Sequence, residues 1–448
     1  MKITKKHSII SLALFTALFI SLPGMADDEE STAKATAKSS AKKTKRGFQP
    51  SVKLGIEDIQ LETGWLPDAP EANGHHTLSL SPYVLWQPSR EWEFRGGIRL
   101  DAMAQTGKVD HNEALVDYTD TYVRYRAADT RITLGAQTIL WGRVDEIAPT
   151  DRVSRADLTR FILDDLPERR RSQLAARLEQ NWGETKLDLV WLPVFRAAQM
   201  PDLDSVWSPI NRTTGRIIGI APSPVISGAI ATSRIEDDEH GSGGGGARLK
   251  QTGESFDFGL TLSRTRHSLP YYEIIPAGPV TRFVGRHPFS NQLGLDVELT
   301  TGDLVWRMET VYNSDIPVTL NTLSFDTVKS FEWVGGLEFF PGGKDTRVNL
   351  QLAARKLLTD KPILDMGEYY GLNGEIETEF GNGRWKAGAR FATGLNKHDV
   401  YLNPSIKFVG WEPHELYLAL HYFEGSDNTL GGFHQDHSLV SVGLKTRF

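Results

Sequence analysis

The chain has no cysteine among its 448 residues, which excludes disulfide bonds, thiolate metal sites and a cysteine nucleophile. Beyond the N-terminus it also lacks long hydrophobic runs, and its mean hydropathy is −0.33. A membrane-spanning helix needs about 20 apolar residues, so we expect none in the mature chain. A membrane β-barrel is compatible with this composition because its strands alternate lipid-facing and lumen-facing residues.

The N-terminus carries the features of a secretion signal. Three lysines precede an apolar run over residues 9–22, and small residues follow at Gly24 and Ala26. A run of about 14 residues is too short to span a membrane as a helix. We therefore predict a signal peptide over residues 1–26, which places the protein in the exported class.

Residues 27–49 are predicted to be a disordered periplasmic tail, because 27–47 is rich in Ala, Ser, Thr and Lys without an aromatic residue. The basic stretch over residues 42–46 resembles a nucleic-acid-binding patch. An exported protein rarely meets nucleic acid, so we interpret this stretch as part of a solvated tail and expect no nucleic-acid partner.

From residue 50 onward, runs of about ten residues alternate apolar and polar side chains, the period of a β-strand. In the run 91–105, Trp92 and Ile98 fall on one face, and Glu93 and Arg95 fall on the other. The same alternation recurs over 131–140, 185–193, 254–263, 292–299 and 384–391.

The connections between these runs are of two alternating kinds. Tight turns such as Ala128-Asp129-Thr130 and Asn382-Gly383 alternate with long connections such as 143–170 and 194–242. Short turns on one rim and long loops on the other are typical of outer-membrane barrels. We predict an all-β fold over residues 50–448, a closed transmembrane antiparallel up-and-down β-barrel of about 18 strands. Closure is required because lipid cannot satisfy the backbone groups of an open edge.

The last run supports the same prediction. Val440, Val442 and Leu444 share a face, and the chain stops at the aromatic Phe448. This ending resembles the C-terminal signal that the bacterial barrel-assembly machinery reads, although Thr446 stands where an apolar residue is usual. We expect that machinery, and outer-membrane lipid with lipopolysaccharide, to be partners of the chain.

The alternation turns most strand charges inward, into a lumen that about eighteen strands make wide enough for an aqueous channel. Basic residues come mainly from the early strands and acidic residues from the later ones. Either two walls of opposite sign set up a transverse field that orients solutes, or the charges pair with neighbours and stiffen the wall. The predicted pore-lining residues are Arg95, Arg99, Arg124, Arg126, Arg177, Glu298, Glu309, Glu375 and Glu377.

Residues 143–171 are the longest internal candidate for a constriction, because they are dense in charges of both signs. The spacing of Leu158, Phe161 and Ile162 favours a short helix. The segment either folds inward and narrows the pore, or is a solvated surface loop. Its predicted constriction residues are Arg143, Asp145 and Asp151.

Two motifs carry a resemblance to a known family. Residues 135–145 read Gly-x-Gln-x-x-x-Trp-Gly-Arg-x-Asp, and 191–196 read Trp-Leu-Pro-x-Phe-Arg. With these motifs the chain resembles a poorly characterised family of porin-like outer-membrane proteins, known mainly as a domain of unknown function. Ala136 and Ala148 stand where family members tend to have Arg and Asn. The resemblance implies a barrel without an established substrate, in a family often suspected of moving hydrophobic or aromatic compounds; more distantly, the chain is similar to alginate-export barrels.

Metal binding and catalysis are weakly supported. His75, His76, His434 and His437 fall in the first and last long loops, which closure of the barrel would bring together, and they are weak candidates for a metal site. No nucleophile-elbow motif is present and the other histidines are scattered, so we expect neither an enzyme nor a cofactor.

These observations predict a channel of the bacterial outer membrane that passes small solutes through a charged lumen. The alternatives are a non-conducting surface barrel that binds a partner through its long loops, and a transporter of hydrophobic compounds. The transported solute is not identified by the sequence.

Overall fold

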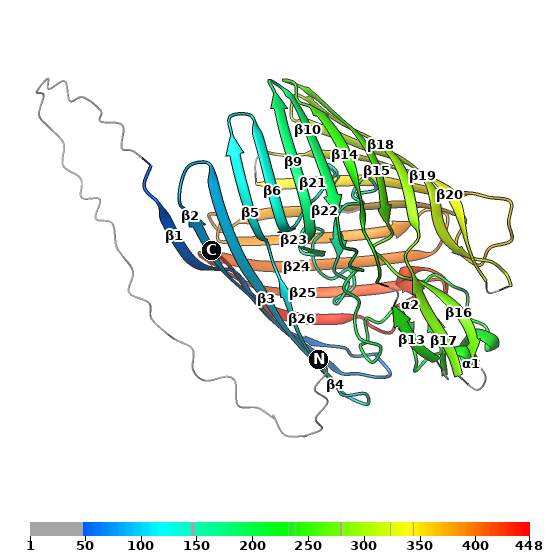
Figure 1. Cartoon of the computed structure of the whole chain (residues 1–448). Coiled ribbons are helices and arrows are strands. Elements are labelled where there is room, and N and C mark those ends of the chain that lie inside the picture. Colours follow the sequence, from blue (N-terminus) through cyan, green and yellow to red (C-terminus); the bar gives the residue numbers. More distant parts are fainter. Residues whose placement is uncertain are drawn as a thin grey trace, which may run out of the picture. The chain divides into compact units, whose positions relative to one another are not determined.

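The computed structural model describes residues 48–144, 148–231, 233–237, 239–277, 280–322, 324–343 and 345–448. The predicted signal peptide, the predicted tail up to residue 47 and the candidate Asp145 lie outside the described residues. Within them, antiparallel strands follow one another around a closed barrel (Figure 1). β4 and β5 both pair with β3 and form one interrupted strand, so the ring has the predicted 18 strands.

The strands that form this ring pair in the order in which they occur along the chain. Their bounds are β1 (Ser51–Trp65), β2 (Gly74–Gln87), β3 (Trp92–Thr106), β4 (His111–Tyr118), β5 (Thr121–Ala127), β6 (Thr130–Gln137), β9 (Gln173–Trp182), β10 (Thr185–Leu192), β14 (Gly244–Gln251), β15 (Phe256–Arg266), β18 (Phe289–Thr301), β19 (Leu304–Thr319), β20 (Phe325–Phe339), β21 (Thr346–Leu358), β22 (Glu368–Phe380), β23 (Trp385–Gly394), β24 (Asp399–Trp411), β25 (His414–Gly425) and β26 (Leu439–Arg447).

The ring closes between its first and last strands. β1 pairs with β26 from Asp58 opposite Arg447 to Trp65 opposite Val440. No strand edge is left open at this seam, as a barrel in lipid requires. The last strand, β26, therefore closes the barrel.

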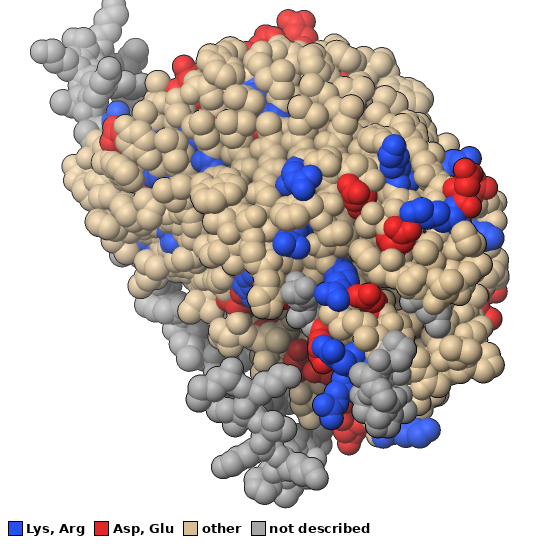
Figure 2. All heavy atoms as spheres, turned by 45° about the vertical axis from the view of Figure 1, so that its right-hand side comes forward, with Lys and Arg blue, Asp and Glu red and all other residues tan. Residues whose placement is uncertain are grey.

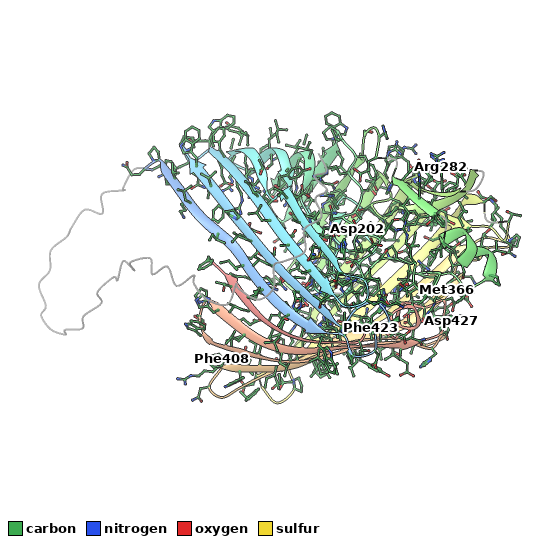
Figure 3. All side chains as sticks on the ribbon, turned by 90° about the horizontal axis from the view of Figure 1, so that it is seen from below. Asp202, Arg282, Met366, Phe408, Phe423 and Asp427 are labelled. Atoms are coloured by element: carbon green, nitrogen blue, oxygen red, sulfur yellow. The ribbon has the colours of Figure 1, made fainter. Side chains whose placement is uncertain are left out.

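The two rims differ in the length of their connections, as the sequence predicts. On the short-turn rim, where β1 begins and β26 ends, the turns are as brief as the two residues between β5 and β6. On the opposite, long-loop rim, β6 and β9 are separated by 138–172, and β10 and β14 by 193–243. Figure 3 places Phe408 toward the short-turn rim, and Arg282, Met366 and Asp427 toward the opposite end.

The strands expose apolar side chains and bury polar ones, the reverse of a water-soluble sheet. On β15, Leu260 and Leu262 are 40% and 54% exposed, whereas Thr261 and Ser263 are buried. On β18, Leu293 is 50% exposed and Asp296 is fully buried. The outer surface is correspondingly poor in charge over a broad area (Figure 2). Apolar residues turned outward and polar residues turned inward are what a lipid environment demands of a barrel.

Aromatic side chains gather on the outer face near the short-turn rim. Trp86 stacks on Phe94 with ring centroids 4.8 Å apart, and Trp385 packs against Phe408 at 4.9 Å. Tyr417 does not join them, because its hydroxyl donates to Glu62 at 2.7 Å inside the lumen. Its position on β25 alternates with the outward-facing Leu416 and Leu418, which explains its inward direction.

The long-loop rim carries smaller elements. β13 (Ser233–Asp237), β17 (Val280–Arg286) and β16 (Tyr271–Ala277) form a three-stranded sheet beside α1 (Pro224–Ala231). α2 (Leu430–Phe433) precedes β26, and two short pairs join β7 (Arg155–Ala156) to β8 (Arg170–Arg171) and β11 (Ile210–Asn211) to β12 (Arg216–Ile217). Among the described helices, neither is long and apolar enough to cross a membrane.

Candidate pore constriction

Residues 138–144 and 148–172, here called the crossing segment, fold into the barrel. They leave β6 at Gln137 and return to the adjacent strand β9 at Gln173. Between these points the segment contacts walls on both sides of the lumen, so the inward alternative left open by the sequence is the one the structure shows. The helix predicted around Leu158, Phe161 and Ile162 is wrong: this part of the segment is a series of turns.

The first anchor of the crossing segment is built on Glu309 of β19, whose side chain is fully buried. Its carboxylate accepts from the backbone N–H of Val144 at 3.0 Å and of Thr150 at 3.1 Å, and from the Thr150 hydroxyl at 2.6 Å. The backbone N–H of Arg143 also donates to it. One wall carboxylate thus satisfies several donors of the segment, which fixes the backbone against β19.

Arg143 completes this anchor through its side chain, which is 7% exposed. The guanidinium pairs with Asp257 of β15 at 3.1 Å and with Asp296 of β18. Asp296 is also bonded by Arg248 at 2.9 Å. Gly142 makes this approach feasible, because its φ is +129° and a Cβ there would lie 2.9 Å from the Glu309 carboxylate.

The second anchor lies on the far wall and has the opposite arrangement of charge. Arg390 of β23, only 4% exposed, donates to the backbone carbonyls of Ile162, Leu163 and Asp164 at 2.8–3.1 Å. It also pairs with the Asp165 carboxylate at 2.9 Å. The wall here supplies the donors, and the segment supplies the acceptors.

Arg160 and Glu168 extend the second anchor to the closing seam of the barrel. The Arg160 guanidinium donates to Glu62 of β1 at 2.6 Å, and the Tyr417 hydroxyl donates to the other oxygen of that carboxylate. Glu168 is paired with Lys445 and Arg447 of β26. The middle of the crossing segment is therefore held by the strands on both sides of the seam.

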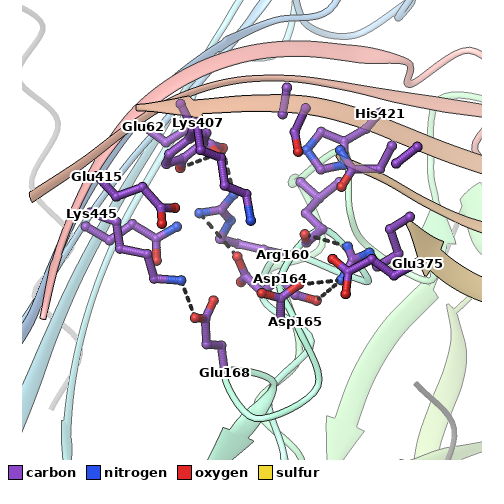
Figure 4. Close-up of a pocket in the computed structure, with 18 residues that line it drawn as sticks. Glu62, Arg160, Asp164, Asp165, Glu168, Glu375, Lys407, Glu415, His421 and Lys445 are labelled. Carbon is purple, nitrogen blue, oxygen red and sulfur yellow. Dashed lines mark hydrogen bonds and ion pairs between the residues drawn. The ribbon is translucent and has the colours of Figure 1, made fainter. Parts of the chain in front are cut away.

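A small cavity of about 80 Å³ lies between the segment and this wall (Figure 4). We call it the acid-rich cavity because six carboxyl groups and four basic side chains line it. The Glu415 carboxyl has no ion-pair partner among the described residues within 4.0 Å. The charged lining is Glu62, Asp164, Asp165, Glu168, Glu375, Glu415, Arg160, Arg390, Lys407 and Lys445.

A second cavity of about 210 Å³, the basic cavity, lies at the other end of the segment. It is bounded by β9, β10 and β14, which stand across the ring from β22–β26. Five basic side chains and one carboxyl group line it, and Arg177 pairs with that carboxyl, Asp188, at 2.6 Å. The other basic groups are Arg143, Lys186, Arg248 and Lys250.

Trp141 fixes the entry of the segment beside this basic cavity. Its side chain is 2% exposed, and its indole N–H donates to Asp188 at 3.1 Å. The ring lies against Gly246 of β14, where an added Cβ would be 2.9 Å from it. The absence of a side chain on the wall therefore allows the indole to pack directly against the backbone.

The predicted pore-lining charges are mostly paired along the wall. Arg95 pairs with Glu57 at 2.7 Å, and Arg99 with Asp101 at 2.9 Å. Arg124 and Arg126 share Glu93, at 2.8 and 3.1 Å. These carboxylates come from the same early strands as the arginines, so the wall of β1–β5 is not uniformly basic. The sequence prediction of basic early strands did not take these carboxylates into account.

The later strands show the same pairing. Glu298 pairs with Arg307 at 3.0 Å, Glu375 with Arg347 at 3.3 Å, and Glu377 with Lys386 at 3.1 Å. Asp151 belongs to the crossing segment, where it pairs with Arg170 at 2.8 Å. Of the residues predicted from sequence, Arg143 and Glu309 anchor the segment, and Asp151 stabilises it internally. Glu375 lines the acid-rich cavity, and Arg143 and Arg177 line the basic cavity.

The candidate histidines converge at the long-loop rim, with one exception. His434 and His437 are joined through their Nδ1 atoms at 2.9 Å, and His437 Nε2 lies 3.0 Å from Glu71. His75 packs edge-on against Trp207, whereas His76 bonds to Thr63 instead. Burial lowers the pKa of His434 well below its ordinary range.

The described residues contain one group of three possible metal ligands whose donor atoms lie within 4.8 Å of one another. This group is His111, Asp202 and Asp204, which lies at the surface and does not include the predicted histidines. Exposed acidic groups of this kind are common without an ion, so the group carries no assignment.

Comparisons with known proteins bear on the fold alone. No family model and no curated protein sequence matches the chain, so the family resemblance stays a prediction. Among solved structures, Acinetobacter baumannii OccAB1 is similar with a TM-score of 0.53 and 8% identity, over 90% of this chain and 98% of that one. Pseudomonas aeruginosa OccK3 (OpdO) gives a TM-score of 0.50 and 9% identity, over 89% and 95%.

An anion-selective porin from Comamonas acidovorans also matches, with a TM-score of 0.41 and 11% identity, over 89% of this chain and all of that one. These identities leave the substrate open. The chain has the fold of a closed 18-stranded antiparallel barrel, and its structural neighbours include porins.

Proposed function

We propose that this protein is a porin-like channel of the bacterial outer membrane, through which small solutes diffuse past the crossing segment. The observation that carries the proposal is the inverted burial of the strands, combined with a charged segment held inside the ring. An apolar exterior suits lipid, and a polar interior suits a water-filled lumen. The short-turn rim would face the periplasm, since both ends of the barrel lie there.

The arrangement also supports a constriction with two differently charged sides. The acid-rich cavity and the basic cavity lie against opposite walls, and rings or walls of fixed charge govern which ions enter a pore. Low-dielectric walls strengthen such fields at close quarters. We therefore propose that polar and ionic solutes are oriented as they pass the crossing segment.

The absence of cysteine from the chain permits a clean test of the channel. Ser405 lines the acid-rich cavity, whereas its neighbour Ile406 is exposed on the outer face. Single-channel currents are recorded in planar bilayers for Ser405→Cys and Ile406→Cys before and after a cationic methanethiosulfonate reagent. We expect resolved steps in both variants, reduced by the reagent in Ser405→Cys alone.

A barrel that folds and inserts but never conducts would contradict the proposal. It would leave the alternative of a surface barrel that binds a partner through its long loops. Equal modification effects in Ser405→Cys and Ile406→Cys would contradict the placement of the pore.

A further inference from the structure

A third cavity, of about 290 Å³, lies among the loops of the long-loop rim. Unlike the two charged cavities, it is lined almost wholly by apolar and aromatic side chains, and by no Lys, Arg or His. Ile217, Ile218 and Ile220 come from the loop between β10 and β14, and Tyr271 and Ile274 come from β16. Cavities of this size and lining are typical of small-molecule sites.

The floor of this apolar cavity is the outer side of the constriction. Leu158 and Phe161 of the crossing segment line it, while Arg160 and Asp164, their neighbours in sequence, line the acid-rich cavity. Consecutive residues of one segment thus separate an apolar compartment from a charged one. A molecule held in the apolar cavity would rest directly against the constriction.

Phe161 holds an unusual backbone conformation at this partition. Its φ is +53°, in the left-handed region that is strained for a residue with a side chain. Its backbone N–H donates to the Leu158 carbonyl at 2.8 Å, and its ring packs on His434 with centroids 4.3 Å apart. Such strain persists where the surrounding structure fixes it, and it tends to occur at functional sites.

Two polar atoms of the lining lack partners. Among the described residues, neither the hydroxyl of Tyr271 nor the indole N–H of Trp207 makes a hydrogen bond, and both atoms are buried. A buried donor without an acceptor destabilises the folded protein, and a ligand that supplies the acceptor would recover this loss. Both residues line the apolar cavity, but the two polar atoms lie behind the lining, so a ligand acceptor reaches one only when the side chain turns toward it.

The remaining polar lining favours a neutral ligand. Asp365 accepts from the backbone N–H of Thr319 at 2.5 Å, and burial raises the pKa of its carboxyl. The lining offers an anionic ligand no cation to pair with. A cavity of about 150 Å³ with an apolar lining holds benzene, so about twice that volume suits two fused rings.

We propose that the apolar cavity is a binding site for a neutral, two-ring hydrophobic molecule that carries one hydrogen-bonding group, which the Tyr271 hydroxyl contacts. The site lies on the outer side of the crossing segment, and its place before a pore rests on the proposed channel function. Binding itself does not require conduction. The ligand would be retained by burial of its rings and oriented by its single polar group.

The test uses 2-naphthol and naphthalene as probes, with the full mature protein in lipid nanodiscs. Binding is measured by titration calorimetry against empty nanodiscs. Ile218→Trp fills the cavity from its wall, whereas the matched control Val225→Trp adds the same ring at a position of the same loop that is 66% exposed. Tyr271→Phe removes the hydroxyl and retains the ring.

We expect saturable 2-naphthol binding in the wild type and in Val225→Trp, and its loss in Ile218→Trp. Tyr271→Phe should weaken 2-naphthol about 3- to 10-fold and leave naphthalene unchanged, the range for one lost hydrogen bond. Binding equal to that of empty nanodiscs, or equal in Ile218→Trp, would overturn the site. Tighter binding of 2-naphthylmethylammonium than of 2-naphthol would overturn the assignment of a neutral ligand.

These outcomes are separate from those of the channel experiment. The calorimetry involves no current, and the Ser405→Cys recordings involve no naphthol. A barrel that binds 2-naphthol but does not conduct would reject the channel and retain the site. A conducting barrel that binds no probe would reject the site and retain the channel.

Discussion

Glu309 of β19 and Arg390 of β23 hold two stretches of the crossing segment by opposite chemistry. At β19 the wall contributes a buried carboxylate, Glu309, and the segment contributes N–H and hydroxyl donors. At β23 the wall contributes the Arg390 guanidinium, and the segment contributes carbonyls and a carboxylate. The comparison teaches that the segment is oriented as well as tethered, because exchanging these two stretches would place donors against donors and acceptors against acceptors.

The two anchors also differ in how much depends on one side chain. At the first anchor Glu309 accepts from the backbone N–H groups of Arg143, Val144 and Thr150, and the pairs of the Arg143 guanidinium with the wall carboxylates Asp257 and Asp296 add to it. The far anchor is shared between Arg390, the pair of Arg160 with Glu62, and the contacts of Glu168 with β26. Removing one wall side chain should therefore weaken the attachment of the segment more at the first anchor, on β19, than at the second.

Glu309→Ala should produce the largest effect. It leaves three backbone N–H groups, two of them buried, and the Thr150 hydroxyl without their acceptor; each buried donor costs about 1–3 kcal/mol. We expect the segment to detach from β19, with a larger and noisier single-channel conductance. Glu338→Ala is the matched control, because Glu338 pairs with Arg307 and Arg347 of the wall and does not contact the segment.

Unchanged conductance in Glu309→Ala, in a barrel that still shows heat-modifiable migration on gels, would contradict the role of this anchor. Equal effects in Glu309→Ala and Glu338→Ala would show that the wall is weakened generally.

Arg390→Ala should also increase the single-channel conductance, but by less than Glu309→Ala does. It removes the donors to the carbonyls of Ile162 and Leu163, but Arg160 and Glu168 still hold the segment. Arg390→Lys should recover only part of the wild-type conductance, because an ammonium cannot reproduce the planar fork that reaches several carbonyls. Arg384→Ala, at the exposed turn before β23, is the control. A conductance in Arg390→Ala larger than in Glu309→Ala would reverse the order of the anchors.

The ring of strands could be predicted because its signal is local. Alternation such as that of Trp92 with Glu93 occurs within each run, and the alternation of short and long connections orders the runs around the barrel. Most of the crossing segment was also predicted, since the charge density of residues 143–171 marked it and Arg143 lies at the first anchor; Trp141 and Gly142 had appeared only in the family motif.

The partners of the segment could not be predicted in the same way. Arg390 and Asp165 are 225 residues apart, and Arg143 and Glu309 are 166 apart. Alternation shows that such residues point inward but says nothing of their height along the strand or of what they face. Glu62, Lys407, Glu415 and Lys445 are inward positions of their strands, and no spacing distinguished them from other paired wall charges.

The short helix was predicted wrongly for a related reason. The spacing of Leu158, Phe161 and Ile162 matches one helical face, but their backbone is set by the hydrogen bonds of Arg390 to the carbonyls that follow. Those carbonyls would otherwise serve a helix. A tertiary contact thus determines the backbone here in place of the local pattern. The sequence of the segment alone does not indicate that contact.

The smallest effect is expected for ion selectivity, and it should have opposite signs at the two charged cavities. The double variant Glu375→Gln with Glu415→Gln removes negative charge from the acid-rich cavity, which should shift the reversal potential toward anions. Lys186→Gln with Lys250→Gln removes positive charge from the basic cavity and should shift it toward cations. Both shifts should shrink as salt rises, because fixed charges are screened beyond about 10 Å at 0.1 M salt. Reversal potentials measured across a potassium chloride gradient give the sign of each shift. A shift in only one of the two double variants would show that ions pass the crossing segment on one side only. The comparison of the two anchors would then describe how the segment is held but not how it selects.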